Sequence, residues 1–123
     1  MTARKRAKVY YNPRCTTCRR AIDRLKASKV DFELQDFFKD KLSKNEIRSL
    51  LKMAGVSPRD ALRKKDKMYK ELRLAEEEYS DDEMISLMEK YPGLILRPII
   101  VLGGTKAVIA NRPEIADAFS REA

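Results

Sequence analysis

The stretch YYNPRCTTCRR, residues 10–20, contains the only two cysteines of the 123-residue chain. An apolar run leads into it, and the dipeptide Asn12-Pro13 then turns the chain. Cys15 falls at the expected start of a helix, and Cys18 is one of the core-facing positions of that helix. A strand, a loop, Cys-x-x-Cys and a helix, in this order, are typical of a thiol redox motif.

The expected surroundings of Cys15 favour its thiolate. A free cysteine has a pKa near ~8.5, so only about 3 % of it is ionised at pH 7. Unpaired N–H groups at a helix start stabilise an anion, and Arg14, Arg19 and Arg20 add positive charge nearby. We therefore expect a reactive Cys15; the alternative is that both cysteines are small buried side chains.

The composition indicates a globular protein, with 43 % hydrophobic and 37 % charged residues, and we expect residues 1–123 to form one domain. No apolar run approaches the ~18 residues of a membrane span, and no signal region follows the basic N-terminus. Two cysteines at this spacing fit a reducing compartment. We therefore expect a cytoplasmic protein with no membrane partner, and no metal site, because zinc needs four Cys or His ligands and the chain has no histidine.

The net charge of +8 comes from 27 basic and 19 acidic residues. The basic residues are scattered, with the longest clusters at residues 4–6 and 63–65, and no aromatic platform for single strands is visible. Direct nucleic-acid binding is therefore not expected. A solvated basic surface or a site for a small oxyanion accounts for the charge.

Hydrophobic periodicity predicts a strand over residues 8–11, a helix over 16–28 and a half-buried strand over 30–36 that is parallel to the first. Capping boxes at Ser43–Glu46 and Ser80–Glu83 start two helices within a block of helices at about 43–90. Within this block, Ser57-Pro58 is expected to open a further short helix.

The C-terminal part predicts a hairpin and a last helix. The run 94–102 is rich in β-branched residues, Gly103-Gly104 forms an expected two-residue turn, and 106–110 returns as the partner strand. The expected core face of the last helix consists of Ile115, Ala118 and Phe119. The order βαβ, helices, ββα predicts an α/β protein of thioredoxin topology with a helical insertion at about 43–90.

Four ordered motifs resemble the glutaredoxin-linked arsenate reductases (ArsC type) and the related Spx-type regulators. They are Tyr11-Asn12-Pro13-x-Cys15-x-x-x-Arg19, Ala61-Leu62-Arg63-Lys64, Leu96-Arg97-Pro98-Ile99 and Asn111-Arg112-Pro113-Glu114. The resemblance spans nearly the whole chain, from Val9 to Phe119.

The resemblance implies that Cys15 is the nucleophile and that three arginines bind an oxyanion such as arsenate. These arginines are Arg63, Arg97 and Arg112. Guanidinium groups bind such anions through paired donors, which agrees with this assignment. The resemblance also implies supporting roles for Asn12 and Arg19 and a cis Pro98 packed beside Cys15. No bound cofactor is implied, although glutathione is a candidate co-substrate.

Two positions depart from the reductase pattern. Tyr11 stands where many of these reductases have a histidine, and Cys18 stands where many have a serine. Cys18, as an alternative to an external thiol, would resolve the adduct by closing a disulfide with Cys15, which thioredoxin or glutaredoxin would reduce.

Three functions follow from this resemblance. The first is an arsenate reductase-like thiol oxidoreductase. The second is an Spx-type regulator that binds RNA polymerase and uses a Cys15–Cys18 switch, and the third is a general disulfide reductase. Arg112 favours the first, because Spx-type sequences usually lack an arginine at this position.

Overall fold

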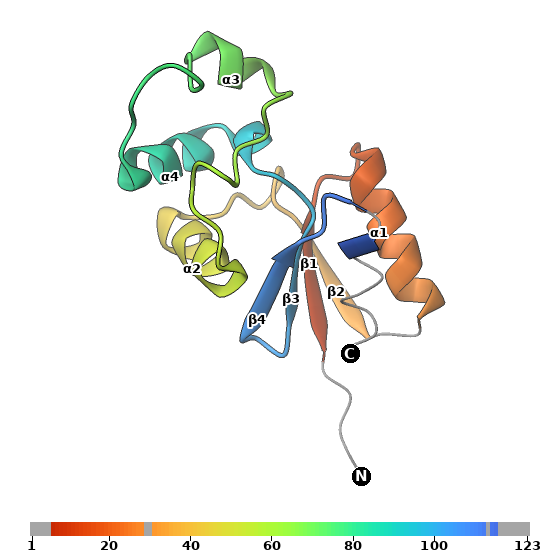
Figure 1. Cartoon of the computed structure of the whole chain (residues 1–123). Helices are drawn as coiled ribbons and strands as arrows, with labels where there is room; N and C mark the ends of the chain where they lie inside the picture. The colour runs from red at the N-terminus through yellow and green to blue at the C-terminus, as the bar shows by residue number, and fades with distance from the viewer. Residues whose placement is uncertain (1–5, 29–30, 113, 116–123) are drawn as a thin grey trace.

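The computed structural model describes residues 6–28, 31–112 and 114–115. Within these residues, the sheet has the strand order β2–β1–β3–β4 (Figure 1). The strands are β1 (Ala7–Tyr11), β2 (Phe32–Asp36), β3 (Ile99–Leu102) and β4 (Lys106–Ile109). β1 pairs in parallel with β2 and antiparallel with β3, and β3 pairs antiparallel with β4. This confirms the predicted thioredoxin-like α/β fold.

The sheet separates two hydrophobic clusters, because successive side chains on a strand point to opposite faces. On one face, Ala7 and Val9 of β1 pack with buried residues of helix α1 (Thr16–Ala27). On the other face, Tyr10 packs with the helical block. Figure 1 shows α1 on one side of the sheet and the helices α2 and α4 on the other. The loop that contains Cys15 joins the end of β1 to the start of α1.

The helical block contains α2 (Lys44–Ala54), α3 (Lys67–Glu71) and α4 (Asp81–Lys90). Both predicted capping boxes are present: the Ser43 and Ser80 hydroxyls each accept an N–H three residues on, and the glutamate there accepts the cap N–H. Each such cap typically stabilises a helix by about 1 kcal/mol. Gly55 ends α2 in the left-handed conformation, with φ 67°.

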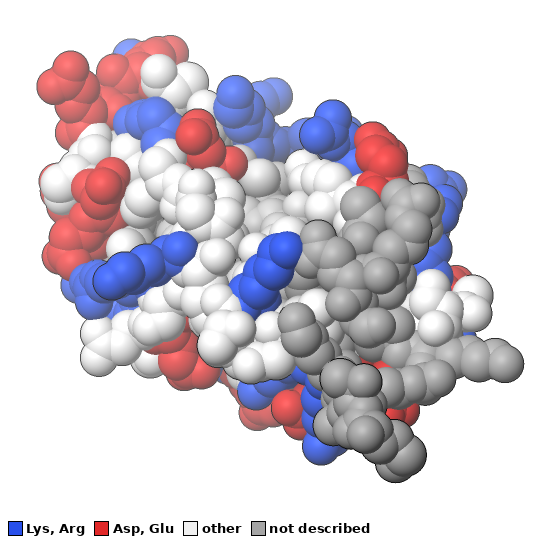
Figure 2. Space-filling model, turned by 60° about the horizontal axis from the view of Figure 1, so that its bottom comes forward, with Lys and Arg blue, Asp and Glu red and all other residues white. Residues whose placement is uncertain are grey.

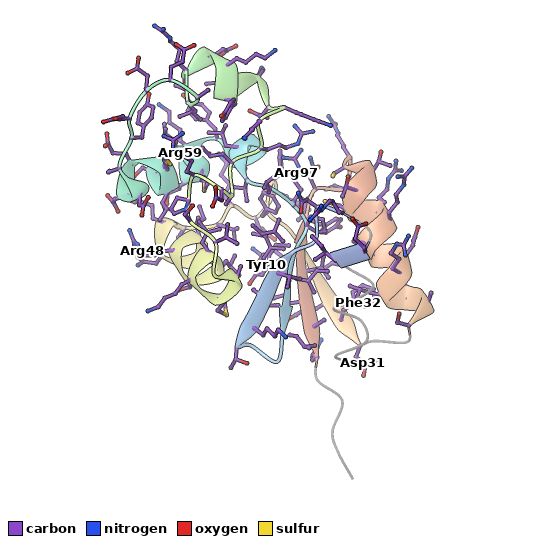
Figure 3. All side chains as sticks on the ribbon, in the orientation of Figure 1. Tyr10, Asp31, Phe32, Arg48, Arg59 and Arg97 are labelled. Carbon is purple, nitrogen blue, oxygen red and sulfur yellow. The ribbon has the colours of Figure 1, made fainter. Side chains whose placement is uncertain are left out.

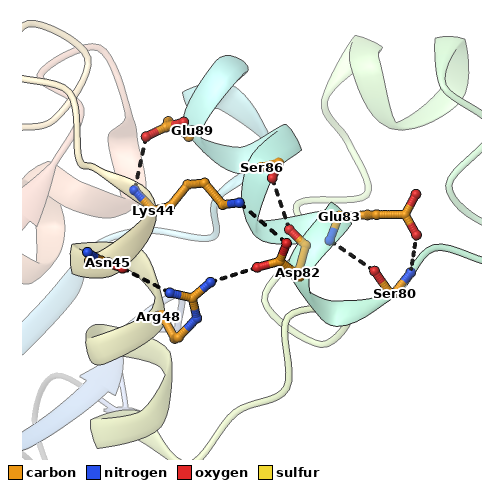
Figure 4. Close-up of polar contacts among 8 residues, drawn as sticks. All are labelled: Lys44, Asn45, Arg48, Ser80, Asp82, Glu83, Ser86 and Glu89. Atoms are coloured by element: carbon orange, nitrogen blue, oxygen red, sulfur yellow. Dashed lines mark hydrogen bonds and ion pairs between the residues drawn. The ribbon is translucent and has the colours of Figure 1, made fainter.

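Polar contacts join α2 to α4 (Figure 4). Asp82 accepts from Arg48 at 2.7 Å and from Lys44 Nζ at 3.4 Å, while the Lys44 N–H donates to Glu89 at 3.0 Å. The two ion pairs are exposed and therefore contribute little. The buried Ile47 and Met88 of the shared hydrophobic cluster contribute more to this packing.

The prediction of a short helix that begins at Ser57-Pro58 is wrong. Residues 58–61 form hydrogen-bonded turns instead, with the Ala61 N–H donating to the Ser57 carbonyl at 3.1 Å. Leu62 then pairs with Ile95 in an isolated antiparallel bridge. This long-range pairing requires extended backbone, so no helix continues through Leu62.

Two predicted boundaries and one predicted burial also change. The strand predicted over 94–102 is confined to β3, because Pro92–Leu94 forms a 3-10 helix and Pro98 has no N–H to donate to the sheet. The hairpin loop has three residues, 103–105, since Leu102 pairs with Lys106. β2 is an edge strand, and its Leu34 is 45 % exposed where a buried position was expected.

The predicted last helix lies mostly outside the described residues. Glu114 and Ile115 are helical, and Ile115 packs against the α1-side cluster. Pro113, Ala118 and Phe119 fall outside the described residues, as do Lys29 and Val30 before β2.

The face turned forward in Figure 2 shows basic and acidic groups interspersed among uncharged residues. No helix among the described residues has the length and apolar character that crossing a membrane requires.

Candidate active site

Asn12 shapes the loop that presents Cys15. Its side-chain oxygen accepts the Arg14 N–H at 3.1 Å, and its carbonyl accepts the Cys15 N–H at 3.0 Å. These bonds turn the chain between β1 and α1 and leave Cys15 as the N-cap of α1. Asn12, which was expected to support the site, thus contacts the Cys15 backbone directly.

The two thiols have opposite environments. Cys15 is partly exposed, and its Sγ accepts the Cys18 N–H at 3.4 Å. Burial raises the pKa of Cys15, but the Cys18 N–H and thiol and the Arg97 guanidinium together bring this pKa below its ordinary value. Cys18 is fully buried, and burial raises its pKa to about 12, with the neighbouring Cys15 adding to the rise. Of the two thiols, Cys15 is therefore the one that ionises more readily.

Arg97 is a buried cation, only 9 % exposed. Its Nη1 donates to the carbonyls of Gly93 at 3.0 Å and Ile95 at 3.4 Å. Its Nε–H is buried without a hydrogen-bond partner among the described residues. Figure 3 places Arg97 at the end of the sheet where α1 begins. A buried unpaired donor is costly.

Pro98, directly after Arg97, is fully buried, and the Arg97–Pro98 peptide bond is cis, as the resemblance implied.

Two backbone hydrogen bonds join the segment that carries Arg63 to the segment just before β3, which carries Arg97. The Arg63 N–H donates to the Leu94 carbonyl at 2.7 Å, and the Leu96 N–H donates to the Ala61 carbonyl at 2.9 Å. Gly93 lies so close to the Asp66 carboxylate that a side chain at position 93 would clash with it. Segments far apart in the sequence therefore meet at this point.

A cleft of about 360 Å³ contains Cys15, Arg63 and Arg97 in its wall. Its other lining residues are Thr17, Asp60, Leu62, Lys64, Lys65, Leu96 and Asn111. Lys64 and Lys65 were not among the predicted site residues, although the basic run 63–65 was visible in the sequence. Four cations in the wall make the cleft suited to an anion.

Two predicted arginines lie outside the wall of this cleft. Arg112 follows the lining residue Asn111, but its side chain is 69 % exposed and its Nε lies 3.9 Å from the Glu114 carboxylate. Arg19 is exposed on α1. The structure thus unites Cys15, Arg63 and Arg97, and it leaves Arg112 and Arg19 at the surface.

Among the described residues, no group of three or more His, Cys, Asp or Glu side chains is arranged to hold a metal ion.

The chain is similar to several known proteins. It is 38 % identical to the uncharacterised protein YfgD of Escherichia coli over 89 % of this chain and 92 % of that one. It is 36 % identical to an arsenate reductase of Escherichia coli over 80 % of this chain and 70 % of that one. The global transcriptional regulator Spx of Streptococcus pyogenes is 31 % identical over 93 % of this chain and 85 % of its own.

The solved structure of an arsenate reductase from Vibrio cholerae covers 93 % of this chain and 97 % of its own, with a TM-score of 0.85 and 29 % identity. The family model described as the ArsC family matches residues 10–119. With this match and these relatives, the chain belongs to the ArsC family.

Proposed function

We propose that this protein is a thiol-dependent arsenate reductase in which Cys15 is the nucleophile. The observation that carries the proposal is the buried Arg97 beside Cys15, with one donor unpaired, in a cleft lined by further cations. A thiolate with a lowered pKa attacks best where the oxyanion's charge is neutralised.

The proposed reaction takes two steps. In the first, the Cys15 thiolate attacks arsenic(V), forming an S–As bond while one As–O bond breaks and its oxygen leaves as water. In the second, another thiol attacks the Cys15 sulfur. A disulfide forms, the S–As electron pair stays on arsenic, and arsenic(III) leaves as arsenite. Two thiols are oxidised as one arsenate is reduced.

Cys18 is the proposed internal source of the second thiol, since its backbone already contacts Cys15. Because its pKa is raised, it stays protonated while Cys15 attacks, and it must lose that proton to resolve the adduct. Thioredoxin or glutaredoxin would then reduce the Cys15–Cys18 disulfide, and glutathione is the alternative resolving thiol.

Arg63 and Arg97 are the proposed oxyanion ligands in the cleft wall. Arg112 is proposed as a third ligand that must first leave Glu114, and their 3.9 Å separation at an exposed site makes that ion pair weak.

Arsenate-dependent thiol oxidation by the purified protein tests the proposal, with glutathione/glutaredoxin and thioredoxin supplied in separate reactions. Turnover with at least one donor, abolished in Cys15→Ser, is the expected result. Turnover that survives in Cys15→Ser, or none with either donor, rules the reductase out.

A second function is supported by the Spx relative and by the Cys-x-x-Cys pair. In this alternative, closing the Cys15–Cys18 disulfide switches binding to RNA polymerase. Capture of purified RNA polymerase by the oxidised but not the reduced chain, together with no arsenate turnover, would favour it.

A further inference from the structure

Phe38 is a large apolar side chain that is 37 % exposed. It lies two residues after β2 ends, in a turn built by Asp36. The Asp36 carboxylate accepts the N–H groups of Phe38 at 3.0 Å and Lys39 at 3.3 Å. The turn therefore holds the Phe38 backbone in place although the ring is partly open to solvent.

The Phe38 ring lies against the guanidinium of Arg97. The Arg97 Cζ is 5.3 Å from the ring centroid, within the range of a cation–π contact. The ring also packs at a tilt of 52° against Phe37, with 5.1 Å between centroids. Phe37 is fully buried and so provides a fixed support.

The other contacts of Arg97 leave its orientation incompletely determined. Both carbonyl partners, Gly93 and Ile95, accept from the same nitrogen, Nη1. These two bonds hold one of the three guanidinium nitrogens, and the contact of Arg97 with the Cys15 thiol is a further polar contact of the group. A ring against the guanidinium restricts its rotation and so helps to keep that contact in place.

We propose that Phe38 is a positioning residue, whose ring holds the Arg97 guanidinium at the cleft wall beside Cys15. The role of the Arg97 charge in oxyanion binding rests on the proposed function. The placement of that charge next to the Cys15 thiol does not, and this allows the two ideas to be tested separately.

The other ionisable groups near Cys15 must be the same in all variants compared. They are Cys18 of α1 and the cleft residues Asp60, Arg63, Lys64 and Lys65. None of them is changed in the experiment.

The experiment compares Phe38→Leu and Phe38→Tyr with the wild type, and it uses Leu34→Ala as the control. Leu34 is a second exposed large hydrophobic residue, 45 % exposed, and lies four residues before Phe38. Iodoacetamide alkylation of Cys15 is followed by mass spectrometry from pH 5 to 10, under a phosphine reductant and without any oxyanion.

In Phe38→Leu we expect the alkylation midpoint of Cys15 to shift upward. The thiolate population at pH 6 should fall roughly two- to fivefold, the factor given by loss of one cation–π contact at a partly exposed site. Phe38→Tyr should restore the wild-type profile, and Leu34→Ala should leave it unchanged. If the substitutions acted only by loosening the packing, the alkylation profiles of Phe38→Leu and Phe38→Tyr would not differ in this way.

An unchanged profile in Phe38→Leu, or an equal shift in Leu34→Ala, overturns the positioning role. Circular dichroism checks folding, and Phe38→Met replaces Phe38→Leu with the same expectation if the latter unfolds. Arsenate kcat/KM is measured in parallel. If the wild type fails to reduce arsenate, the proposed function fails while the alkylation profiles still decide the role of Phe38.

Discussion

The inner wall of the cleft, Cys15 and Arg97, differs from the exposed outer rim in how the side chains are held. The outer rim consists of Lys64 and Lys65, which line the cleft, and of Arg112, which follows the lining residue Asn111. Arg97 is buried and bonded to two carbonyls, whereas Arg112 is 69 % exposed and has one weak ion pair. Lys64 and Lys65 are exposed as well. Fixed charges in a dry site act strongly on a reaction, while exposed ones are screened by salt.

This contrast assigns different roles to charges of the same sign. The inner wall is prepared before any anion arrives, so we expect it to act on the reacting atoms. The outer rim must rearrange or act at a distance, so we expect it to act mainly on anion capture. The following experiments test this division, from the largest expected effect to the smallest.

Replacing Arg97 should have the largest effect. In Arg97→Ala we expect arsenate kcat/KM to fall about 100- to 1000-fold, as when a fixed donor to a developing charge is lost. The alkylation midpoint of Cys15 should rise, because Arg97 lowers the pKa of that thiol. Arg97→Lys should recover only part, since lysine lacks the planar fork.

Arg48→Ala is the matched control, because it removes an arginine on α2 whose exposed side chain pairs with Asp82. A loss below tenfold in Arg97→Ala would show that the inner wall is not the centre of the site.

Arg112→Ala should cost less, roughly ten- to hundredfold in arsenate kcat/KM, the range for one charge-assisted hydrogen bond. The alkylation profile of Cys15 should not change, since Arg112 lies outside the cleft wall and is not among the groups that lower the pKa of this thiol. Unchanged arsenate kinetics would remove Arg112 from the site and favour the redox-switch alternative.

The buried Cys18 thiol should make stability depend on alkaline pH. Folding raises its pKa from an ordinary 9.0 to about 12, so the folded chain keeps a proton that the unfolded chain loses. Its contribution is complete below pH ~9 and is lost as pH rises toward 12, by up to ~1.4 kcal/mol for each pH unit.

Urea unfolding of the wild type and Cys18→Ala from pH 8 to 11, under a reductant, measures this contribution. The difference in unfolding free energy between the two proteins should shrink with pH, since the ionisable groups that do not contact Cys18 cancel in the comparison. A constant difference would mean that the Cys18 thiol ionises as freely in the folded chain as in the unfolded one.

The smallest effect is expected at the two lysines of the outer rim. The double variant Lys64→Gln and Lys65→Gln should lower arsenate kcat/KM about two- to fivefold at low salt, through KM, and the difference should vanish near 1 M salt. Lys26→Gln with Lys52→Gln, on α1 and α2, is the charge-matched control. Equal losses in both double variants would indicate a general effect of net charge, with no special role for Lys64 and Lys65.

Much of this molecule could be predicted from local sequence. The cap at Cys15, the capping boxes at Ser43 and Ser80 and the αL end at Gly55 depend on contacts between residues a few positions apart. Such contacts form wherever the local residues occur, so the pattern indicates them directly. The apolar run that leads into the Asn12-Pro13 turn likewise predicted the first strand, which is β1.

Only the tertiary structure decided which charges reach Cys15. The pairing of Leu62 with Ile95 replaced an expected helix with extended chain, and it carried Arg63 into the cleft wall. Arg97 and Arg112 both follow the family motif, yet one is buried and the other exposed. Burial and long-range pairing depend on segments that are distant in the chain, and no local pattern records where those segments meet.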